Sequence, residues 1–340
     1  MAPEHKKYKI ATIGSHSALQ ILKGAKDEGF ETICICLKGR EEPYKSFGIA
    51  DKILVINDYK ELFPLQDQLI KENAIIVPHA SFIAYMGVKK TESIKVAYFG
   101  NKKILEWESD RKIERDWLHN AGLKTPKLFD DPKEIDRPVI TKFHGAGGGK
   151  GYFIAKTYED WKEKMKVYKG DQDYVIQEYI VGVPCYIHYF YSPLTDEVEV
   201  MGFDKRYESN VDSLGRISAR DQIALPKIDP SYVIVGNIPM VVRESLLPQV
   251  FKMGRGVVEE SKKICPPGLY GPFCLECIIT PDLDIICFEI SARIVAGTNP
   301  YINGSPYTWL KYNEPMSTGR RIAREIKLAI QKGELKKILQ

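Results

Sequence analysis

Apolar runs of about five residues alternate with amphipathic stretches in the N-terminal part of the chain. The first run, YKIATI (8–13), precedes a segment whose apolar residues recur at helical spacing, and TICICL (32–37) follows that segment. The alternation continues through ILVI (53–56), a helical stretch near 59–72 and AIIVP (74–78). Buried strands that alternate with helices form a parallel sheet covered on both faces. The pattern therefore predicts a small doubly wound α/β domain.

Beyond residue 100 the chain mixes helical and strand-like periods, and no long flexible linker precedes this part. A charged helical stretch near 101–121 ends at Gly122, a residue type that often terminates helices. Further strands are expected near 138–143, 151–156, 174–178, 185–191, 198–204, 216–223, 271–280 and 284–291. Further helices are expected near 158–168, 243–263 and 317–331. We place a domain boundary near residue 100, followed by a region of mixed α and β structure.

Two apolar, strand-like runs in the last quarter of the chain each contain one carboxylate. Glu276 lies in FCLECIIT, Glu289 lies in IICFEIS, and the connection PDLD (281–284) is a turn signal. A hairpin would bring both acids close together. A carboxylate among apolar neighbours is costly unless positive charge lies beside it, and neither run contains Lys or Arg. The pattern predicts a bound cation, and oxygen ligands favour Mg²⁺ shared with substrate phosphates.

A strand that carries Lys142 leads into a glycine-rich loop in PVITKFHGAGGGKGYFIA (138–155). Around Lys150 this loop contains Gly145, Gly147, Gly148, Gly149 and Gly151. Without Cβ atoms, backbone N–H groups can approach phosphate oxygens, and the two lysines supply positive charge. The loop is not a Walker loop, because a glycine follows Lys150 where that motif needs Ser or Thr. We predict a loop that folds over ATP; a merely flexible hairpin is the alternative.

The segment YVIQEYIVG (174–182) is an apolar strand pattern that ends in a polar hinge and Gly182. Main-chain groups at such an edge could hydrogen-bond a flat base, with Glu178 near an exocyclic amine. Alone, this pattern is a weak signal for base binding. Its position between the glycine loop and the acid pair strengthens the prediction.

Two loops in the N-terminal domain follow buried strands and lead into helices. They are Gly14-Ser15-His16-Ser17 and Pro78-His79-Ala80-Ser81. Free N–H groups and the helix dipole favour an anion at such positions, and ligands of open α/β sheets bind at the carboxyl ends of strands. The alternative is that Ser17 and Ser81 only cap helices. The adjacent His16 and His79 favour binding.

The composition is ordinary for a globular protein, with 44% apolar and 28% charged residues among 340. A net charge of +4 suits a small anionic substrate, and no basic tract or zinc-finger spacing indicates nucleic acid. No run approaches membrane-spanning length, and the first residues lack an apolar signal core. The seven cysteines lie mostly in apolar runs, as is typical of reduced thiols in a cytoplasmic protein.

The order of lysine, glycine loop, hinge strand and two glutamates resembles the ATP-grasp superfamily of carboxylate–amine ligases, and AGLKTPK (121–127) looks like the entry to its ATP-binding lobe. Within it, the chain is similar to the archaeal formate-dependent ligases of purine synthesis. The motifs that carry this second similarity, specific only as a set, are GSHSALQI (14–21), PHASFIAY (78–85), KRYESNVD (205–212), VGNIPMVVRESLL (235–247), CFEISARIVAGTN (287–299) and GSPY (304–307).

The resemblance implies a domain arrangement and a reaction. The domains would be a Rossmann-like domain over 1–100 and an ATP-grasp domain over 101–340, with an ATP lobe at about 126–182 and a metal and substrate lobe at about 183–340. ATP would phosphorylate formate to formyl phosphate, which the amine of AICAR (aminoimidazole carboxamide ribonucleotide) would attack. The resemblance also implies Mg²⁺ or Mn²⁺ as the metal and a homo-oligomer.

Roles for individual residues follow from the same resemblance. The metal ligands would be Glu276 and Glu289, and Lys142 with the 145–151 loop would grip the phosphates. The adenine and ATP contacts would be Glu178, Tyr179 and Ile180 at the hinge, and Glu208. The AICAR contacts would be His16, Ser17, Ser81 and Asn237.

Arg293 is a further catalytic candidate beside Lys142 and Lys150, since strand alternation places residues 289, 291 and 293 on one side. It could grip the transferring phosphate or formate, and an ordinary salt bridge accounts for it equally well. Arg220 and Arg243 are weaker candidates of the same kind. Many ATP-grasp enzymes carry Asn two residues after the second metal glutamate. Here that position is Ser291, so its role at the metal is open.

Two rival functions remain at this point. One keeps the fold and joins another carboxylate to another amine. The other is a nucleotide-binding paralogue without turnover, such as a sensor. A non-catalytic relative would be free to lose one metal acid, and both Glu276 and Glu289 are present. A purely structural protein would leave the glycine loop unexplained.

Overall fold

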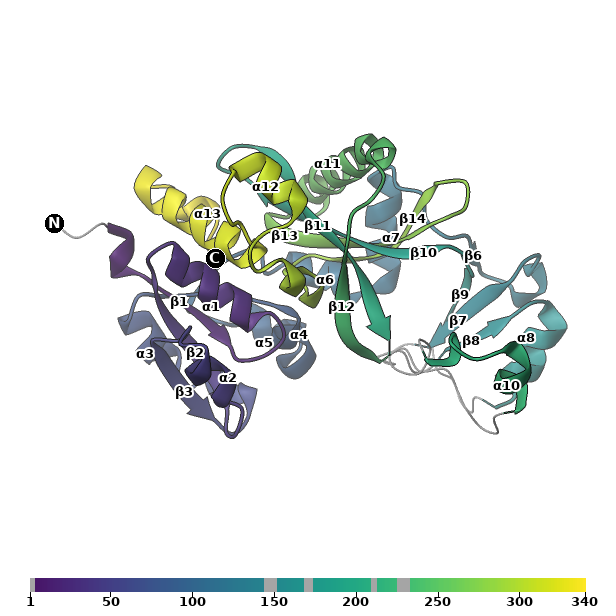
Figure 1. Ribbon diagram of the computed structural model, residues 1–340, viewed down its shortest axis with the longest axis horizontal. Helices are drawn as coiled ribbons and strands as arrows, with labels where there is room; N and C mark the ends of the chain where they lie inside the picture. The colour runs from purple at the N-terminus through teal and green to yellow at the C-terminus, as the bar shows by residue number, and fades with distance from the viewer. Residues whose placement is uncertain (1–3, 144–151, 168–173, 209–212, 225–232) are drawn as a thin grey trace.

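Three β-sheets with their packed helices make up the molecule, and Figure 1 shows them side by side along its long axis. The computed structural model describes residues 4–143, 152–167, 174–208, 213–224 and 233–340. The predicted combination of an α/β domain with an α+β region is confirmed. All seven cysteines are buried with free thiols, as expected. No helix in the described part of the chain is long and apolar enough to cross a membrane.

The N-terminal sheet is parallel throughout, in the order β3-β2-β1-β4-β5. Its strands are β1 (Lys9–Ile13), β2 (Glu31–Leu37), β3 (Lys52–Ile56), β4 (Ala74–Ile76) and β5 (Ala97–Tyr98). The helices are α1 (Ala18–Asp27), α2 (Glu42–Ser46), α3 (Gln66–Lys71), α4 (Ala80–Met86) and α5 (Val88–Glu92), with 3-10 helices η1 (Glu4–Lys7) and η2 (Tyr59–Leu62). This is the doubly wound arrangement that the alternating pattern predicts.

Both faces of the parallel sheet are buried. On β1, Ile10 packs in one apolar cluster with Ile21 of α1, while its neighbour Ala11 packs in another with Leu69 of α3. Successive strand residues point to opposite faces, so a strand covered on both sides must be apolar throughout. The helix expected near 59–72 is divided into η2 and α3 around Pro64, because proline has no N–H to donate to the carbonyl one turn earlier.

The central sheet is antiparallel, in the order β12-β11-β10-β13-β14. Its strands are β10 (Val183–Ser192), β11 (Glu197–Glu208), β12 (Ile234–Met240), β13 (Gly271–Ile279) and β14 (Ile285–Ser291). On β10, Ile187 and Tyr189 share a buried cluster with residues of α7 (Arg111–Asn120) and α11 (Leu247–Ile264). Because side chains alternate along a strand, Tyr186 and His188 face the opposite side of the sheet.

The third sheet is small and lies at the far right in Figure 1. Its four antiparallel strands, in the order β6-β9-β7-β8, are β6 (Leu128–Phe129), β9 (Tyr174–Glu178), β7 (Val139–Phe143) and β8 (Tyr152–Ala155). Helix α8 (Tyr158–Met165) covers one face, where Trp161 Nε1 donates to Thr141 Oγ1 at 2.9 Å. The remaining elements are α6 (Ile104–Ser109), α12 (Pro306–Tyr312), α13 (Thr318–Lys332), η3 (Pro132–Glu134), η4 (Glu244–Leu246), η5 (Ala296–Tyr301) and η6 (Leu335–Lys337).

Two parts of the predicted pattern are wrong. The strand expected at 216–223 is instead the helix α10 (Ala219–Ala224). Ser218 Oγ accepts from the Asp221 N–H at 3.2 Å and donates to the Asp221 carboxylate at 2.7 Å, a helix-start signal that outweighs the apolar alternation. The helix expected near 101–121 is broken into α6 and α7 at Asp110, whose extended backbone and side chain cap α7.

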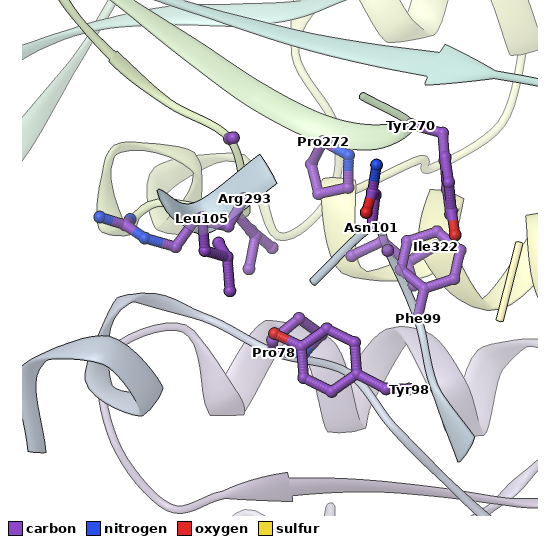
Figure 2. A pocket seen from close by; sticks show the side chains of 12 residues that line it. Pro78, Tyr98, Phe99, Asn101, Leu105, Tyr270, Pro272, Arg293 and Ile322 are labelled. Atoms are coloured by element: carbon purple, nitrogen blue, oxygen red, sulfur yellow. The ribbon is translucent and has the colours of Figure 1, made fainter. Parts of the chain in front are cut away.

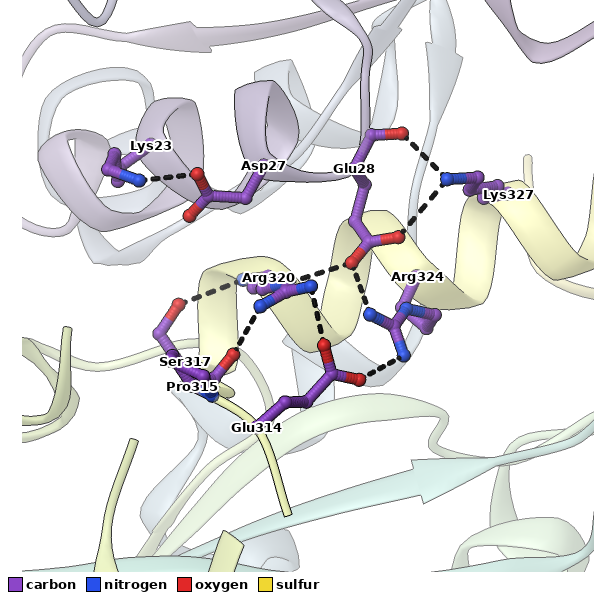
Figure 3. A network of polar contacts seen from close by, with 9 residues as sticks. All are labelled: Lys23, Asp27, Glu28, Glu314, Pro315, Ser317, Arg320, Arg324 and Lys327. Carbon is purple, nitrogen blue, oxygen red and sulfur yellow. Dashed lines mark hydrogen bonds and ion pairs between the residues drawn. The ribbon is translucent and has the colours of Figure 1, made fainter. Parts of the chain in front are cut away.

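Helix α13, from the C-terminal part of the chain, packs closely against α1 of the N-terminal domain. A Cβ atom on Gly24 would lie 2.2 Å from Arg320 N, and one on Gly319 would lie 2.2 Å from Gln20 O. These glycines therefore let the two backbones meet. Figure 3 shows the ion pairs that flank this contact, in which Glu28 at the end of α1 meets Arg320, Arg324 and Lys327 of α13.

The last residues of the sequence extend the edge of the parallel sheet. Tyr98 of β5 exchanges backbone hydrogen bonds with Gln340 in both directions at 2.9 Å, and Phe99 forms a bridge with Leu339. The N-terminal fold thus includes residues from both ends of the sequence. The division into 1–100 and 101–340 stays a prediction.

Gly319→Ala is expected to destabilise the protein by about 1–3 kcal/mol, because the added methyl would overlap the Gln20 backbone. Chemical denaturation followed by circular dichroism measures this change. Gly236→Ala, where an added Cβ meets open space, is the matched control. A Gly319→Ala protein as stable as the control would show that α1 and α13 are not constrained by this contact.

Candidate functional site

The two glutamates that the sequence singles out lie opposite one another on the β13–β14 hairpin. Glu276 pairs with Glu289 across the two strands, just before a shift in register. Residues directly opposite in an antiparallel pair point to the same face. The connecting turn is closed by the Thr280 N–H, which donates to Asp284 O at 2.9 Å. The predicted hairpin is therefore confirmed.

A row of polar side chains crosses one face of the central sheet at the level of this acid pair. Strand pairing places these residues on that face: Glu289 on β14, Glu276 on β13, Tyr186 and His188 on β10, Asp204 and Arg206 on β11, and Asn237 on β12. We call this set the polar row. It faces away from α7 and α11 and joins the acid pair at one end to Asn237 at the other.

Arg206 lies in the middle of the polar row and is the residue that sequence reasoning missed. Its Nη2 donates to Glu276 Oε1 at 2.5 Å, and its guanidinium carbon lies 3.9 Å from the centre of the Tyr186 ring. The absence of Lys and Arg from the two acid-bearing runs therefore does not leave Glu276 without a cation. The partner comes from β11, which neighbours neither strand of the hairpin, so the local pattern carried no signal for it.

The negative charge of the second acid, Glu289, is incompletely compensated by its surroundings. Glu289 is open to a cleft, but the surrounding protein displaces bulk water from it. This loss of hydration, and next the charge of Glu276, raise the pKa of Glu289 to about 7. Lys142 of β7 opposes the shift. A bound cation would relieve the same repulsion, so the two carboxylates fit a metal site.

Glu276 and Glu289 would form a complete metal site only together with oxygen atoms of the substrate. In the described part of the chain, no cluster of three or more His, Cys, Asp or Glu residues is placed to hold a metal. Two carboxylates alone suit Mg²⁺ that keeps waters and binds substrate phosphates. Ser291 lies on β14 opposite Cys274, and no metal contact is assigned to it.

A cleft of about 630 Å³ lies between the small sheet and β14. Lys142 of β7, Glu289 and Phe288 of β14, and Arg111 of α7 line it together with residues of β6 and β9. Lys142 Nζ lies 5.3 Å from the centre of the Phe288 ring. Burial, and next to it the charge of Arg111, lower the pKa of Lys142 while Glu289 opposes the change. The cleft is large enough for a nucleotide, and its lining includes the positive charges of Lys142 and Arg111.

The expected adenine hinge lies at the end of β9. The Glu178 carboxylate accepts from the Lys127 N–H at 3.1 Å and from Arg137 at 3.1 Å, while Tyr179 N donates to Pro138 O at 2.8 Å. The amide of Tyr179 is thus used within the protein. A base contact at Tyr179 would have to use its carbonyl, and no contact in the structure tests Ile180.

Two acids of α6 and α7 cover the free edge of β14. Glu114 accepts from the Ile290 N–H at 2.7 Å, and Glu108 accepts from the Ala292 N–H at 2.9 Å. Burial, and next the charge of Glu289, raise the pKa of Glu114 well above its ordinary value. These bonds satisfy an otherwise unpaired strand edge and fix β14 beside the cleft. In the sequence both acids look like ordinary charges of an exposed helix.

Arg293 lies beyond the end of β14, so strand alternation does not apply to it. It forms a salt bridge with Glu108 at 2.8 Å, and its Nε has no hydrogen-bond partner among the described residues. Figure 2 shows Arg293 beside a small cavity of about 20 Å³, which Tyr98 and Pro78 of the N-terminal domain also line. Arg293 thus lies between α6 and the residues that follow β4 and end β5, and its catalytic role stays a prediction.

The two loops of the N-terminal domain come together as expected. The His16 and His79 rings stack with centres 5.4 Å apart, and Ser81 Oγ donates to Ser15 Oγ at 3.0 Å. His16 keeps an exposed surface, but the surrounding protein displaces bulk water from it; this loss of hydration, and next the charge of the other ring, lower its pKa to about 2. Burial lowers the pKa of His79 to about 4. Both rings are therefore neutral at pH 7.

The capping interpretation of the two serines is wrong. Ser17 precedes α1 without a side-chain cap, and its Oγ instead bonds His16 Nδ1 at 2.8 Å. Helix α4 is capped by His79, whose side chain accepts from the Ser81 N–H. His16 has a left-handed backbone (φ 52°), which is uncommon for a residue other than glycine and occurs often at functional sites.

Asn237 is held at the far end of the polar row by a buried chain of hydrogen bonds. Its Nδ2 donates to Asp204 Oδ2 at 2.8 Å, and Asp204 Oδ1 lies 2.7 Å from His188 Nε2. A Cβ on Gly297 would overlap Asp204, so η5 approaches closely here. From the same helix, Asn299 Nδ2 donates to His16 O at 3.1 Å. Helix η5 thus links the end of the row to the His16 loop.

The remaining predicted residues fall into two groups, those outside the described residues and those that the structure places on other elements. Gly145, Gly147, Gly148, Gly149, Lys150 and Gly151 lie outside the described residues. Glu208 ends β11. Of the two weaker arginine candidates, Arg220 belongs to α10 and Arg243 directly precedes η4.

The hairpin with opposed glutamates, the adjoining cleft and the half-buried lysine place this chain in the class of ATP-grasp ligases. Solved structures share the fold. The ADP complex of purK, an N5-carboxyaminoimidazole ribonucleotide synthetase, has a TM-score of 0.67 and covers 96% of this chain and 78% of its own, at 15% identity. At that identity the similarity concerns the fold alone.

Closer relatives define the family. Residues 10–129 match the model described as "Protein of unknown function (DUF1246)", and 154–340 match "Domain of unknown function (DUF1297)". Proteins named 5-formaminoimidazole-4-carboxamide-1-(beta)-D-ribofuranosyl 5'-monophosphate synthetase are 56% identical in Pyrococcus abyssi and 51% identical in Methanocaldococcus jannaschii, each over 97% of this chain and over 98% and 94% of the relative. The chain belongs to this synthetase family. The crystal structure of an IMP biosynthesis protein PurP from Thermococcus kodakaraensis agrees, with a TM-score of 0.77, 30% identity and coverage of 97% of this chain and 100% of that one.

Without added metal, the stability of the protein is expected to fall as pH rises from about 4.5 to about 7. The folded state holds a proton on Glu289 that the unfolded chain releases near the ordinary pKa of 4.5, so rising pH favours unfolding across this window. Thermal unfolding at pH 5 and pH 8 measures the change, with Glu289→Gln as the comparison. Equal pH dependence in the two proteins would show that Glu289 ionises normally.

Mg²⁺ should stabilise the wild type more at pH 8 than at pH 5, because protons compete with the metal.

Proposed function

We propose that this protein is an ATP- and formate-dependent ligase that formylates AICAR in purine biosynthesis and releases ADP and phosphate. The observation that carries the proposal is the polar row. It links a carboxylate pair beside a nucleotide-sized cleft to Asn237 and, through Asn299, to the His16 loop. The relatives' name supports the same reaction. Their species also support an archaeal source.

The first step joins formate to the γ-phosphoryl group of ATP. One formate oxygen attacks the γ-phosphorus and ADP leaves, so that formate and ATP become formyl phosphate and ADP with no change in total charge. Phosphoryl transfer depends on positioning and charge neutralisation. Lys142 supplies positive charge in the lining of the cleft. Glu276 and Glu289 would hold Mg²⁺ or Mn²⁺, which would neutralise phosphate charge.

The second step transfers the formyl group. The amine of AICAR attacks the formyl carbon, the bond from carbon to phosphate oxygen breaks, and the amine proton leaves with the phosphate. The neutral His16 ring, Ser17, Ser81 and Asn237 would hold AICAR at the meeting of the two domains. A neutral ring can donate or accept a hydrogen bond there without binding the phosphate too tightly. Because water would hydrolyse formyl phosphate, closure over the site matters.

The nucleotide is proposed to lie in the cleft between the small sheet and β14. The glycines of the 145–151 loop and Lys150 would cover its phosphates. Glu178, Tyr179 and Ile180 would border the base, and Glu208 would contact ATP. Two lining residues support this orientation: Lys142, a cation for phosphate, and Glu289, which also belongs to the polar row.

The proposal includes a cytoplasmic homo-oligomer. The seven free, buried thiols fit a reducing compartment. Large apolar side chains are exposed on the edge strand β12 and on helix α12, where Val235, Trp309 and Leu310 are 63%, 52% and 84% exposed. Large exposed apolar surfaces commonly mark interfaces. Light scattering after gel filtration measures the assembly, and a monomer at micromolar concentration would exclude it.

The deciding assay follows ADP release and loss of the AICAR aromatic amine together, omitting ATP, Mg²⁺, formate or AICAR in turn. Both signals should rise only in the complete mixture. ADP release that ignores formate or AICAR would keep the fold and point to another acid or amine. Binding of ATP with no ADP under any condition would identify a sensor.

Lys142→Met is expected to lower kcat by about 10²–10³-fold, because it removes positive charge next to the transferring phosphate. Steady-state ADP release measures this loss. Lys162→Met, an exposed lysine of α8, is the matched control and should keep full activity. A Lys142→Met enzyme with unchanged kcat and ATP KM would remove Lys142 from the mechanism.

A further inference from the structure

The proposed reaction needs a binding group for formate. The sequence offers Arg293 as a candidate, but the structure pairs it with Glu108, and the relatives' names supply no other. Formate must lie where it can reach both the γ-phosphate and the AICAR amine. The phosphate end of the polar row is marked by Glu276 and Glu289, and the amine end by Asn237. Formate has only three heavy atoms. Its binding group must therefore lie between these ends.

Arg206 is the cation at that position. It neighbours Asn237 across β11 and β12, and it contacts Glu276 at 2.5 Å. The other cations near the row are placed differently. Lys142 lies on the cleft side, beside Phe288, and Arg293 is paired with Glu108. Among the described residues, Arg206 alone joins the two ends.

The guanidinium has donors left for a ligand. An arginine side chain carries five N–H donors. Within the described ranges, Glu276 is its one hydrogen-bond partner, and the side chain keeps 26% of its exposure. The Tyr186 ring, 3.9 Å away, supports the flat face of the guanidinium and leaves its edge accessible. A planar fork of this kind binds a planar carboxylate through two parallel hydrogen bonds.

We propose that Arg206 binds formate and then the formyl phosphate that forms from it. This inference rests on the proposed function and adds the carboxylate site to it. Arg206 would hold formate by its carboxylate while one oxygen attacks the γ-phosphorus, and no proton moves in that step. A metal ion on Glu276 would take over the charge pairing of that carboxylate. The donor now given to Glu276 would then be available to the substrate.

The experiment measures KM for formate, ATP and AICAR in Arg206→Lys and Arg206→Gln. Loss of a bidentate charged contact should raise the formate KM by about 10- to 100-fold, more in the Gln variant, and leave the other two within about threefold. Arg255→Lys, an exposed arginine on α11, is the matched control. Circular dichroism and thermal unfolding check that each variant folds.

Competition by nitrate gives a second measurement of the same binding site. This planar anion should compete with formate in the wild type, and its inhibition constant should rise in Arg206→Lys in parallel with the formate KM. For a variant too slow to assay, broadening of the [¹³C]formate resonance in the presence of Mg²⁺ and a non-hydrolysable ATP analogue reports binding directly.

The outcomes separate this inference from the proposed function. Wild-type ADP release that needs no formate would overturn both. Formate-dependent release with an unchanged formate KM in the Arg206 variants, or formate binding equal to wild type, would overturn only the role of Arg206. A change confined to the Mg²⁺ requirement would show that Arg206 serves only as the partner of Glu276. A selective rise in formate KM supports the inference.

Discussion

Two carboxylates on adjacent strands, facing the same side, impose the constraint on which the rest of the site depends. Glu276 and Glu289 cannot both stay ionised at close range without positive charge nearby. Arg206 meets one of them from β11, and Lys142 approaches the other from the small sheet. Both cations thus come from strands outside the hairpin, one in the central sheet and one in the small sheet. Charge balance, as much as apolar packing, sets how the small sheet and the central sheet share this region.

The His16 loop is held beside the polar row by residues from the C-terminal part of the chain. Gln20 of α1 donates to both Thr298 and Asn299 of η5 and accepts from the Gly319 N–H of α13. Asn299 in turn donates to the backbone of His16. The strained His16 loop is therefore fixed by residues from two later elements. A loop held on both sides in this way presents its side chains in one orientation, which favours selective binding of a rigid substrate.

The sequence predicts those features that depend on neighbouring residues. Alternating apolar runs reveal the parallel sheet, and a turn between two apolar runs places Glu276 opposite Glu289. It does not reveal Arg206, because 70 residues separate it from Glu276 and only the order of strands brings them together. The same is true of Glu108 and Glu114, whose partners are backbone groups of β14. The strand prediction for 216–223 is wrong for a local reason, because a helix cap at Ser218 outweighs the apolar alternation of these residues.

The contact between α1 and α13 has a consequence for how the protein forms in the cell. Gln20 and Gly319 are 299 residues apart, so α1 leaves the ribosome long before its partner. At about 5–20 residues per second, that delay is on the order of 15–60 s. During this time α13 does not yet cover the apolar face of α1. That face is therefore open to other chains or to chaperones. Completion of the N-terminal fold thus waits for synthesis of α13, and a long stretch of chain must close into a loop before the contact forms.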